Sequence, residues 1–214
     1  MGLGMETDGL RRRPVFARHA VSLLLVREGS AGPEVLMGMR AAAHRFMPNR
    51  LVFPGGGVEA GDVKAAVAAE PSPGLLGMLG RNAQPRLARA LAVAAARELL
   101  EETGLGFGDP PRLDEMAYLC RAVTPPGSPI RFNARFLVAP GEAVSGTLAD
   151  SRELQDLRWR PVAEVGAGDV MEVTFAVLQR LREWLAMDEG ARAGRTVLQV
   201  FKRKAWELER GFEG

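Results

Sequence analysis

The sequence predicts a mixed α/β fold on three observations. Short apolar runs flanked by charged residues, such as Ala20–Val26, are typical of buried strands. One long segment rich in Ala, Leu, Arg and Glu begins at Pro85 and stops at Gly104, as a helix does. Strand-like and helical segments occur in the same chain without an internal repeat, so an all-β fold is not expected.

Length and composition indicate one enlarged globular domain. The chain has 214 residues, of which 47% are hydrophobic and 25% charged, as in ordinary globular proteins. A net charge of +2 does not suggest a partner nucleic acid. The single Cys120 excludes an internal disulfide and a cysteine zinc cluster. Because no apolar run approaches the roughly 18 residues of a membrane span, we expect a cytoplasmic protein without membrane contact.

The expected strands follow a flexible tail at residues 1–17. The runs at 19–27 and 34–40 predict a β-hairpin across a turn that contains two glycines and a proline. Residues 50–54 then lead into Gly55, Gly56 and Gly57, where the missing side chains allow close approaches of the backbone. Further strands are expected at 116–124, 130–139 and 154–160.

The strongest helix prediction covers residues 86–103, with Gly104 as its C-terminal cap. Apolar residues at helical spacing predict two more helices, at 174–187 and 197–210, and the second would form a helical extension over 188–214. Residues 63–89 are rich in Ala, Gly and Pro. They predict a mainly helical insertion, with Pro71–Gly74 as a helix breaker.

Three glutamates gather on one face near the end of the helix at 86–103. Glu98, Glu101 and Glu102 stand at i, i+3 and i+4, so their carboxylates are close neighbours. The C-terminal end of a helix is also the negative end of its dipole, where each acid is disfavoured by roughly 0.3 to 1 kcal/mol. A compensating cation is therefore expected. The alternative is a solvated helix face neutralised by surface bases such as Arg97.

The oxygen atoms of this segment suit a hard divalent cation. Carboxylates, together with a backbone carbonyl from the Gly55–Gly57 turn, are ligands typical of Mg²⁺ or Mn²⁺ rather than of zinc. The bare glycine backbone can also admit a phosphate beside the ion. The sequence therefore predicts a Mg²⁺ or Mn²⁺ site between the turn and the helix.

The same residues resemble the Nudix box. Gly56, Asp62 and the run Arg97–Leu105 are similar to the pattern Gly, five residues, Glu, seven residues, Arg-Glu-hydrophobic-any-Glu-Glu-any-Gly-hydrophobic. The second half matches at every specified position. The first half departs from the pattern in two ways. Asp62 replaces the usual Glu, and 34 residues separate it from Arg97, which is 27 more than the seven of the pattern.

A narrower resemblance is to the branch of the Nudix family that includes coenzyme A diphosphatases. The interrupted box and the elements Phe46-Met47-Pro48 and Phe53-Pro54-Gly55-Gly56 carry this resemblance, which extends over roughly residues 18 to 185. It implies an α/β/α sandwich around a mixed sheet over residues 18–187. It also implies hydrolysis of the diphosphate bond of a nucleoside diphosphate linked to another moiety.

The resemblance further implies roles for single residues. Glu98, Glu101 and Glu102 would hold Mg²⁺ (or Mn²⁺), with the Gly56 carbonyl and Glu153 as further ligands. Glu98 is the first choice for the general base, and Glu101 or Glu153 is the alternative. Arg97 is expected to orient a glutamate rather than to touch the substrate. The residues expected to contact the substrate are Arg40, Arg50, Arg131, Arg135, Phe46, Gly55 and Gly57.

Three functions remain open at this point. The favoured one is a Mg²⁺-dependent diphosphatase with a coenzyme A-like substrate. The second keeps the chemistry but acts on ADP-ribose or a dinucleotide such as NADH. The third is a nucleotide-sensing module without turnover. The inserted residues are expected to form a lobe at the rim of the site, where they can narrow substrate choice or support a homodimer.

Overall fold

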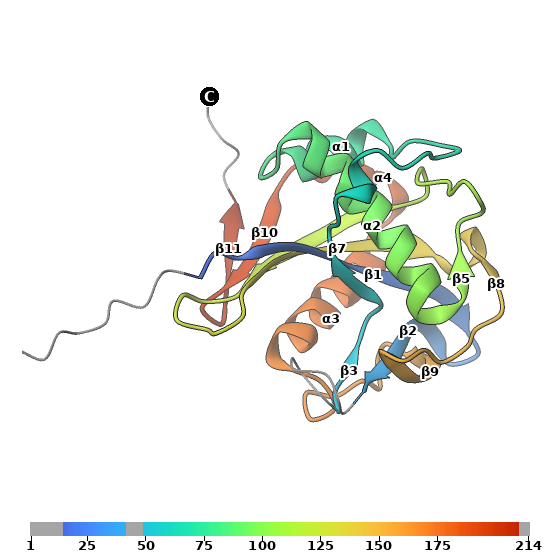
Figure 1. Ribbon diagram of the computed structural model, residues 1–214. Helices are drawn as coiled ribbons and strands as arrows, with labels where there is room; N and C mark the ends of the chain where they lie inside the picture. The colour runs from blue at the N-terminus through green and yellow to red at the C-terminus, as the bar shows by residue number, and fades with distance from the viewer. Residues whose placement is uncertain (1–14, 42–48, 210–214) are drawn as a thin grey trace, which may run out of the picture.

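The computed structural model describes residues 15–41 and 49–209, and a mixed sheet forms its centre (Figure 1). Nine strands of these residues pair in the order β11-β10-β6-β7-β1-β2-β3, with β4 beside β1 and β9 beside β2. β1 is parallel to β7 and β10 to β6, and the other pairs are antiparallel. The strands are β1 (Arg18–Gly29), β2 (Gly32–Arg40), β3 (Leu51–Val52), β4 (Gly55–Gly57), β6 (Ala117–Val123), β7 (Phe132–Pro140), β9 (Leu154–Pro161), β10 (Leu198–Lys202) and β11 (Ala205–Glu209), and a separate pair is formed by β5 (Leu105–Gly106) and β8 (Ser145–Gly146).

The predicted hairpin is confirmed as β1 and β2, which pair up to Gly29 opposite Gly32. The predicted strands at 116–124, 130–139 and 154–160 are confirmed as β6, β7 and β9. Side chains of β1 alternate between two cores, because Leu23 and Leu25 join one cluster and Leu24 joins the other. A central strand with both faces buried is apolar at successive positions, which explains the unbroken run in the sequence.

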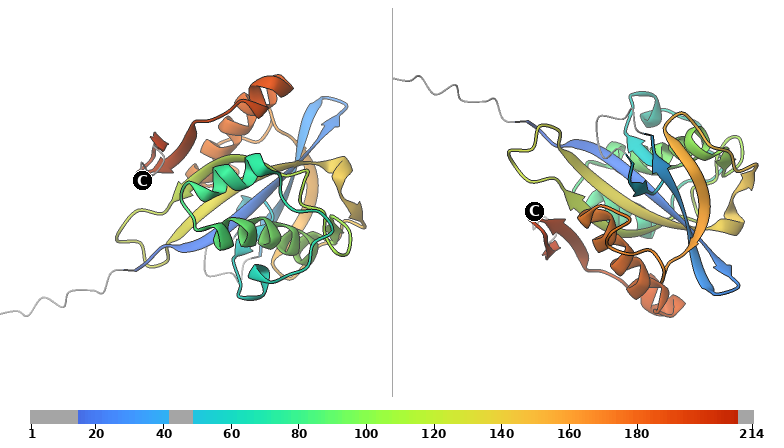
Figure 2. Two further views of the ribbon diagram at one scale, coloured as in Figure 1. Left: turned by 90° about the horizontal axis from the view of Figure 1, so that it is seen from above. Right: turned by 90° about the horizontal axis from the view of Figure 1, so that it is seen from below.

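Helices cover both faces of the sheet, so the predicted α/β/α sandwich is confirmed (Figures 1 and 2). Leucines of α1 and α2 join the cluster of Leu23 and Leu25 on one face. Leucines and a valine of α3 join the cluster of Leu24 on the other face. The α-helices are α1 (Pro73–Gly80), α2 (Pro85–Thr103), α3 (Glu172–Leu185) and α4 (Glu189–Ala193), and short 3₁₀ turns occupy Gly61–Val63 and Gly141–Ala143.

The helix predicted most strongly is present as α2, which runs from Pro85 in its first turn to Thr103. Gly104 ends it in the left-handed conformation, with φ of 74°, and its N–H donates to the Leu100 carbonyl at 3.0 Å. A β-carbon at Gly104 would lie 2.5 Å from the carbonyl oxygen of Thr147. Both the backbone angle and the lack of space therefore require glycine at this cap.

Replacing Gly104 by alanine is expected to lower the free energy of unfolding by about 1 to 3 kcal/mol. Gly77, in the middle of α1, is the matched control, because a β-carbon there would meet nothing within 4 Å. Gly77→Ala is expected to stabilise the protein by about 0.5 to 1 kcal/mol through helix propensity. Urea denaturation of both variants checks that the two changes in the free energy of unfolding have opposite signs. An equal loss of stability in both would contradict the role of Gly104 as the helix cap.

The inserted residues 63–89 contain α1 and the start of α2 within a longer irregular path, so the insertion is only partly helical. Pro71–Gly74 does not break a helix but starts one: Ser72 caps α1 by accepting the N–H of Leu75 at 3.1 Å, and Pro73 lies in the first turn. Proline is tolerated there because the first N–H groups of a helix have no partner within it. α1 lies beside the N-terminal end of α2, whereas the three glutamates lie near the C-terminal end (Figure 1). α1 therefore does not form the lobe that was expected at the rim of the site.

The helix predicted at 174–187 is present as α3, but the one predicted at 197–210 is wrong. This segment forms the hairpin β10–β11, and its turn has Arg203 and Lys204 at φ of 49° and 67°. The spacing of apolar residues in so short a segment fits a helix or a strand. The segment is a strand because β10 pairs with β6. Within 188–209 only α4 is α-helical, and the predicted tail at 1–17 lies almost wholly outside the described residues.

Candidate metal and active site

The glycine turn lies against the central strand β1. β4 pairs with the N-terminal half of β1, where Gly56 is opposite Val21, whereas β2 pairs with the C-terminal half. Gly55 has φ of 152°, and a β-carbon there would lie 2.3 Å from the Val21 carbonyl oxygen and 2.6 Å from the Cα of Ser22. Glycine is therefore the residue that fits. Helix α2 packs against this turn.

Glu102 is buried between α2 and the turn, with 3% of its surface exposed. Its Oε2 atom accepts the N–H of Gly55 at 2.7 Å, and its Oε1 atom is buried without a hydrogen-bond partner. Burial raises the pKa of Glu102 to about 8, against the lowering effect of the Gly55 N–H, and the charge of Glu98 adds to the rise. A buried carboxylate oxygen without a partner is costly, so a ligand is expected to use it.

Glu98 lies one turn earlier on α2 and packs against Gly56. A β-carbon at Gly56 would be 2.2 Å from Oε1 of Glu98, so this glycine leaves the space that the carboxylate occupies. Burial raises the pKa of Glu98, Arg97 lowers it, and the charges of Glu101 and Glu153 raise it further. The carboxylates of Glu98 and Glu102 therefore face the same turn from successive positions on one helix face.

Arg97 holds this arrangement together. Its Nε and Nη2 atoms bind the carboxylate of Asp62 at 3.0 and 3.2 Å, and Nη2 also donates to the Gly57 carbonyl at 2.9 Å. Its Nη1 atom donates to Glu98 at 3.0 Å and to Glu101 at 3.2 Å. The hydrogen bond with Asp62 raises the pKa of Arg97. Arg97 thus contacts Glu98, Glu101 and Asp62, and its expected role of orienting a glutamate stays a prediction.

The donor chemistry of this site fits a hard divalent cation such as Mg²⁺. Glu102 offers a buried, unused oxygen, and Glu98 lies beside the same glycine turn. Across residues 15–41 and 49–209, no three acidic or imidazole side chains converge on one point. Glu101 is the most solvated of the three helix acids, with 58% of its side chain exposed. The structure thus brings two of the predicted carboxylates to the turn and leaves the third at the rim.

Glu153 and Arg40 reach the same place through the pairing of β2 with β9. Arg40 is opposite Leu154, and the N–H of Ala41 donates to the Glu153 carbonyl at 3.0 Å. The charge of Glu153 raises the pKa of Glu102, and the charge of Arg40 lowers it. The charges of both residues therefore act on the carboxylate cluster, and the roles of Glu153 as a ligand and of Arg40 at the substrate stay predictions.

Arg50 and Arg131 are engaged with the backbone elsewhere. Nη1 of Arg50 donates to the Gly168 carbonyl at 3.0 Å. Arg131 donates to the carbonyls of Thr124, at 3.1 Å, and Val15, at 2.7 Å. These contacts tie loops and the start of β1 together, so they do not support the predicted role of either arginine as a phosphate clamp. The predicted substrate residue Phe46 lies outside the described residues.

Arg135 is also structural, because it is only 1% exposed. It donates to the carbonyls of Asn133 and Asn82, both at 2.9 Å, and its Nη1 atom lies 2.9 Å from Nδ1 of His19. Burial lowers the pKa of Arg135 to about 10, and the neighbouring Arg121 adds to this effect. A guanidinium group only donates, so Nδ1 of His19 accepts and the ring proton is on Nε2. Arg135 is thus not accessible to a phosphate.

His19 is expected to make the protein less stable in acid. Burial and then the charges of Arg135 and Arg121 lower its pKa below 6.5 in the folded state. Below about pH 6.5 the unfolded chain therefore binds a proton that the folded chain does not, so the contribution of His19 to stability falls as the pH falls. His19→Gln keeps an acceptor for Arg135 but does not titrate. The difference in free energy of unfolding between His19→Gln and the wild type, measured by urea denaturation, should shift in favour of the variant from pH 7.5 to pH 5. An unchanged difference would contradict this role.

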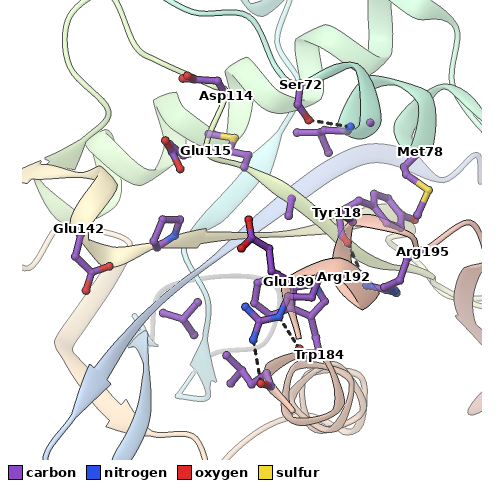
Figure 3. Close-up of a pocket in the computed structure, with 18 of the residues that line it drawn as sticks. Ser72, Met78, Asp114, Glu115, Tyr118, Glu142, Trp184, Glu189, Arg192 and Arg195 are labelled. Atoms are coloured by element: carbon purple, nitrogen blue, oxygen red, sulfur yellow. Dashed lines mark hydrogen bonds between the residues drawn. The ribbon is translucent and has the colours of Figure 1, made fainter. Parts of the chain in front are cut away.

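A second hollow lies away from these residues, beside Ala117 and Tyr118 at the start of β6. This cleft of about 830 Å³ lies between α1 and the end of α3 (Figure 3). Two of its cations are already engaged: Arg195 donates to the carbonyls of Tyr118 and Leu119, and Arg192 donates to those of Trp184 and Leu185. The cleft contains none of the predicted site residues, so it is not the candidate site.

Glu98, Glu101 and Glu102 thus lie on a helix beside a glycine turn, within an α/β/α sandwich, which is the arrangement that the resemblance to the Nudix box implies. The described helices are all too short or too polar to span a membrane. No protein-family model matches the chain, and no curated protein matches it in sequence.

Comparison with solved structures places the chain beside the same class. It is similar to a NUDIX hydrolase from Alicyclobacillus acidocaldarius, with 26% identity, 77% of this chain and 90% of that chain covered, and a TM-score of 0.59. It is similar to the NUDIX domain of Shewanella oneidensis NrtR complexed with ADP ribose, at 17% identity, 80% and 90% coverage and a TM-score of 0.51. A MutT NUDIX hydrolase from Burkholderia pseudomallei matches at 18% identity, 78% and 99% coverage and a TM-score of 0.51. The chain has the Nudix fold, and the likeness supports a Nudix-type pyrophosphohydrolase.

Proposed function

We propose that this protein is a Mg²⁺-dependent Nudix diphosphatase that hydrolyses a nucleoside diphosphate linked to another moiety. The observation that carries the proposal is Glu102. It is buried at the helix end where an acid is least favoured, one oxygen is oriented by the Gly55 N–H, and the other has no partner. A purely structural glutamate at this position would be expected to find a protein partner for both oxygens.

The residues of the chain divide the work as follows. Glu98 and Glu102 would hold the cation, with Glu101, Glu153 and the Gly56 carbonyl as further ligands. When bound, Mg²⁺ supplies positive charge that screens the diphosphate and activates a water molecule. Arg97 orients Glu98, and the Gly55 N–H orients Glu102.

Glu98 is the favoured general base. Its side chain is only 13% exposed, and burial raises its pKa, which makes the carboxylate a better acceptor of the proton of water. Glu101 and Glu153 are the alternatives, because the charges of both act on Glu98. Arg40 is the remaining arginine suited to bind a phosphate near these groups.

A coenzyme A-like substrate is favoured on the sequence resemblance. The interrupted box and the Phe53–Gly56 element are the features of this branch that lie in the described residues. ADP-ribose, which the Shewanella domain binds, and NADH are the alternatives within the same chemistry. A module that binds nucleotides without cleaving them is the alternative outside it.

The test is hydrolysis of a panel that contains coenzyme A, ADP-ribose and NADH, with Mg²⁺ or with EDTA. Mass spectrometry should find two phosphomonoesters whose masses together equal the substrate plus one water, with coenzyme A cleaved fastest and no cleavage in EDTA. Cleavage of ADP-ribose or NADH without cleavage of coenzyme A would overturn the substrate assignment. Binding without cleavage across the panel would favour the sensing module.

A further inference from the structure

The long insertion poses a problem for the geometry of the box. Arg97 orients Glu98 while it is itself held by Asp62. In the usual pattern only seven residues join these two positions, but here 34 residues do. Loop closure costs only about 0.6 kcal/mol for each doubling of loop length, so the ends can still meet. A long loop alone does not fix the direction from which Asp62 reaches Arg97.

Arg89 ties the first part of the insertion to α2. Its Nε and Nη2 atoms donate to the carboxylate of Glu70 at 2.9 to 3.1 Å. Its Nη2 atom also donates to the Ala65 carbonyl at 3.0 Å, and Nη1 donates to the Val63 carbonyl at 3.4 Å. The side chain is 26% exposed, so these bonds are partly shielded from water. A planar fork of donors is suited to hold a carboxylate and carbonyls together.

Arg89 and Arg97 hold consecutive parts of one segment. They are eight residues apart on α2, which corresponds to about 12 Å along the helix axis. Arg97 binds the chain at Gly57 and Asp62, and Arg89 binds the residues directly after it, at 63–70. The segment therefore follows α2 towards its N-terminus and is fastened to the helix by two arginines.

Asp62 is sensitive to the path of the residues that follow it. It is 2% exposed, and its Oδ2 atom accepts both the N–H of Glu59, at 2.7 Å, and Nη2 of Arg97. The next residue is Val63, whose carbonyl Arg89 holds. If the residues after Asp62 left α2, the carboxylate would lose the fixed direction that these bonds need.

We propose that Arg89 is a positioning residue for the metal site. It holds residues 63–70 on α2, and it thereby keeps Asp62 on Arg97 and the carboxylate of Glu98 beside Gly56. Arg89 does not touch the substrate. The inference rests on the proposed function. It adds a residue that is needed because the box carries an insertion, and that a box without the insertion does not need.

The test compares the Mg²⁺ dependence of hydrolysis in Arg89→Ala, Arg89→Lys and the control Arg86→Ala. Arg86 is exposed in the first turn of the same helix. Arg89→Ala is expected to raise the Mg²⁺ concentration for half-maximal rate about tenfold, as loss of a partner that orients a ligand does, with kcat at saturating Mg²⁺ within about twofold. Arg89→Lys is expected to need a Mg²⁺ concentration between those of the wild type and Arg89→Ala, because its ammonium group keeps the charge without the planar fork of donors. A change in Arg89→Ala no larger than in Arg86→Ala would overturn the proposal.

Binding of Mn²⁺ without substrate, followed by its electron paramagnetic resonance signal, separates this proposal from the proposed function. If the wild type binds Mn²⁺ but cleaves nothing, the diphosphatase assignment fails, whereas about tenfold weaker Mn²⁺ binding by Arg89→Ala still supports the positioning role. Equal Mn²⁺ affinity in the two proteins refutes it. If Arg89→Ala does not fold, Glu70→Ala replaces it with an expected weakening of about threefold, because two carbonyl contacts remain.

Discussion

Glu102→Gln is expected to lower the rate of Mg²⁺-dependent hydrolysis about a hundredfold or more while the protein stays folded. The amide fills the same space and can still accept the Gly55 N–H, which Glu102 accepts at 2.7 Å. It cannot supply the negative oxygen that a divalent cation needs. The measurement is the initial rate at saturating Mg²⁺ beside the exposed control Glu115→Gln. An unchanged rate and unchanged Mg²⁺ affinity would mean that the acidic face is structural.

The same variant is expected to change the pH dependence of stability. Without metal, folded Glu102 keeps its proton up to about pH 8, whereas the unfolded chain loses it near 4.5. The folded state therefore binds more protons between these values, and its stability should fall by a few kcal/mol as the pH rises through this window. Denaturation in EDTA should show a larger fall in the wild type than in Glu102→Gln, where the carboxylate of Glu98 still has a pKa raised by burial. Mg²⁺ should reduce the fall in the wild type, because the cation favours the ionised carboxylate.

Gly56→Ala is expected to lower activity about a hundredfold with little loss of stability. The new β-carbon would lie 2.2 Å from Oε1 and 2.4 Å from Cδ of Glu98. These atoms end a flexible side chain, so the carboxylate can move away and the fold can persist. It would then leave its place beside the turn and its bond with Arg97, and a misplacement of this size is costly to catalysis.

Gly61→Ala is the control for Gly56→Ala, because a β-carbon at Gly61 meets nothing within 4 Å. Initial rates and urea denaturation of both variants check the prediction. Gly61→Ala should retain the rate of the wild type, and Gly56→Ala should unfold within about 1 kcal/mol of it. A fully active Gly56→Ala protein would show that the position of Glu98 is not needed for turnover.

The parts of the fold and of the site that the sequence predicted are those with local causes. The i, i+3 and i+4 spacing is enough to place Glu98, Glu101 and Glu102 on one helix face. Glycine at 104 marks the end of that helix because only the left-handed conformation continues the chain there. The buried strands followed from runs of apolar residues, which is the expected pattern when both faces of a sheet are covered.

The parts that the sequence could not predict depend on distant partners. The side chain of Arg135 differs in no way from that of Arg40, yet Arg135 is buried against carbonyls, whereas the charge of Arg40 acts on Glu102. Glu153 comes to the site through pairing of β2 with β9, more than one hundred residues apart. Arg89 carries no motif, and its role is visible only once residues 63–70 lie against it. Tertiary contacts of this kind override local preference.

The C-terminal hairpin has a consequence for where this domain can be cut. β10 covers the edge of β6 from Arg121 to Val123, and β11 then becomes the outermost strand. A protein shortened to the end of α3 would leave the N–H and C=O groups of that edge as a template for a foreign strand. It would retain every residue of the carboxylate site and still be prone to aggregate, so loss of activity in it would say nothing about catalysis.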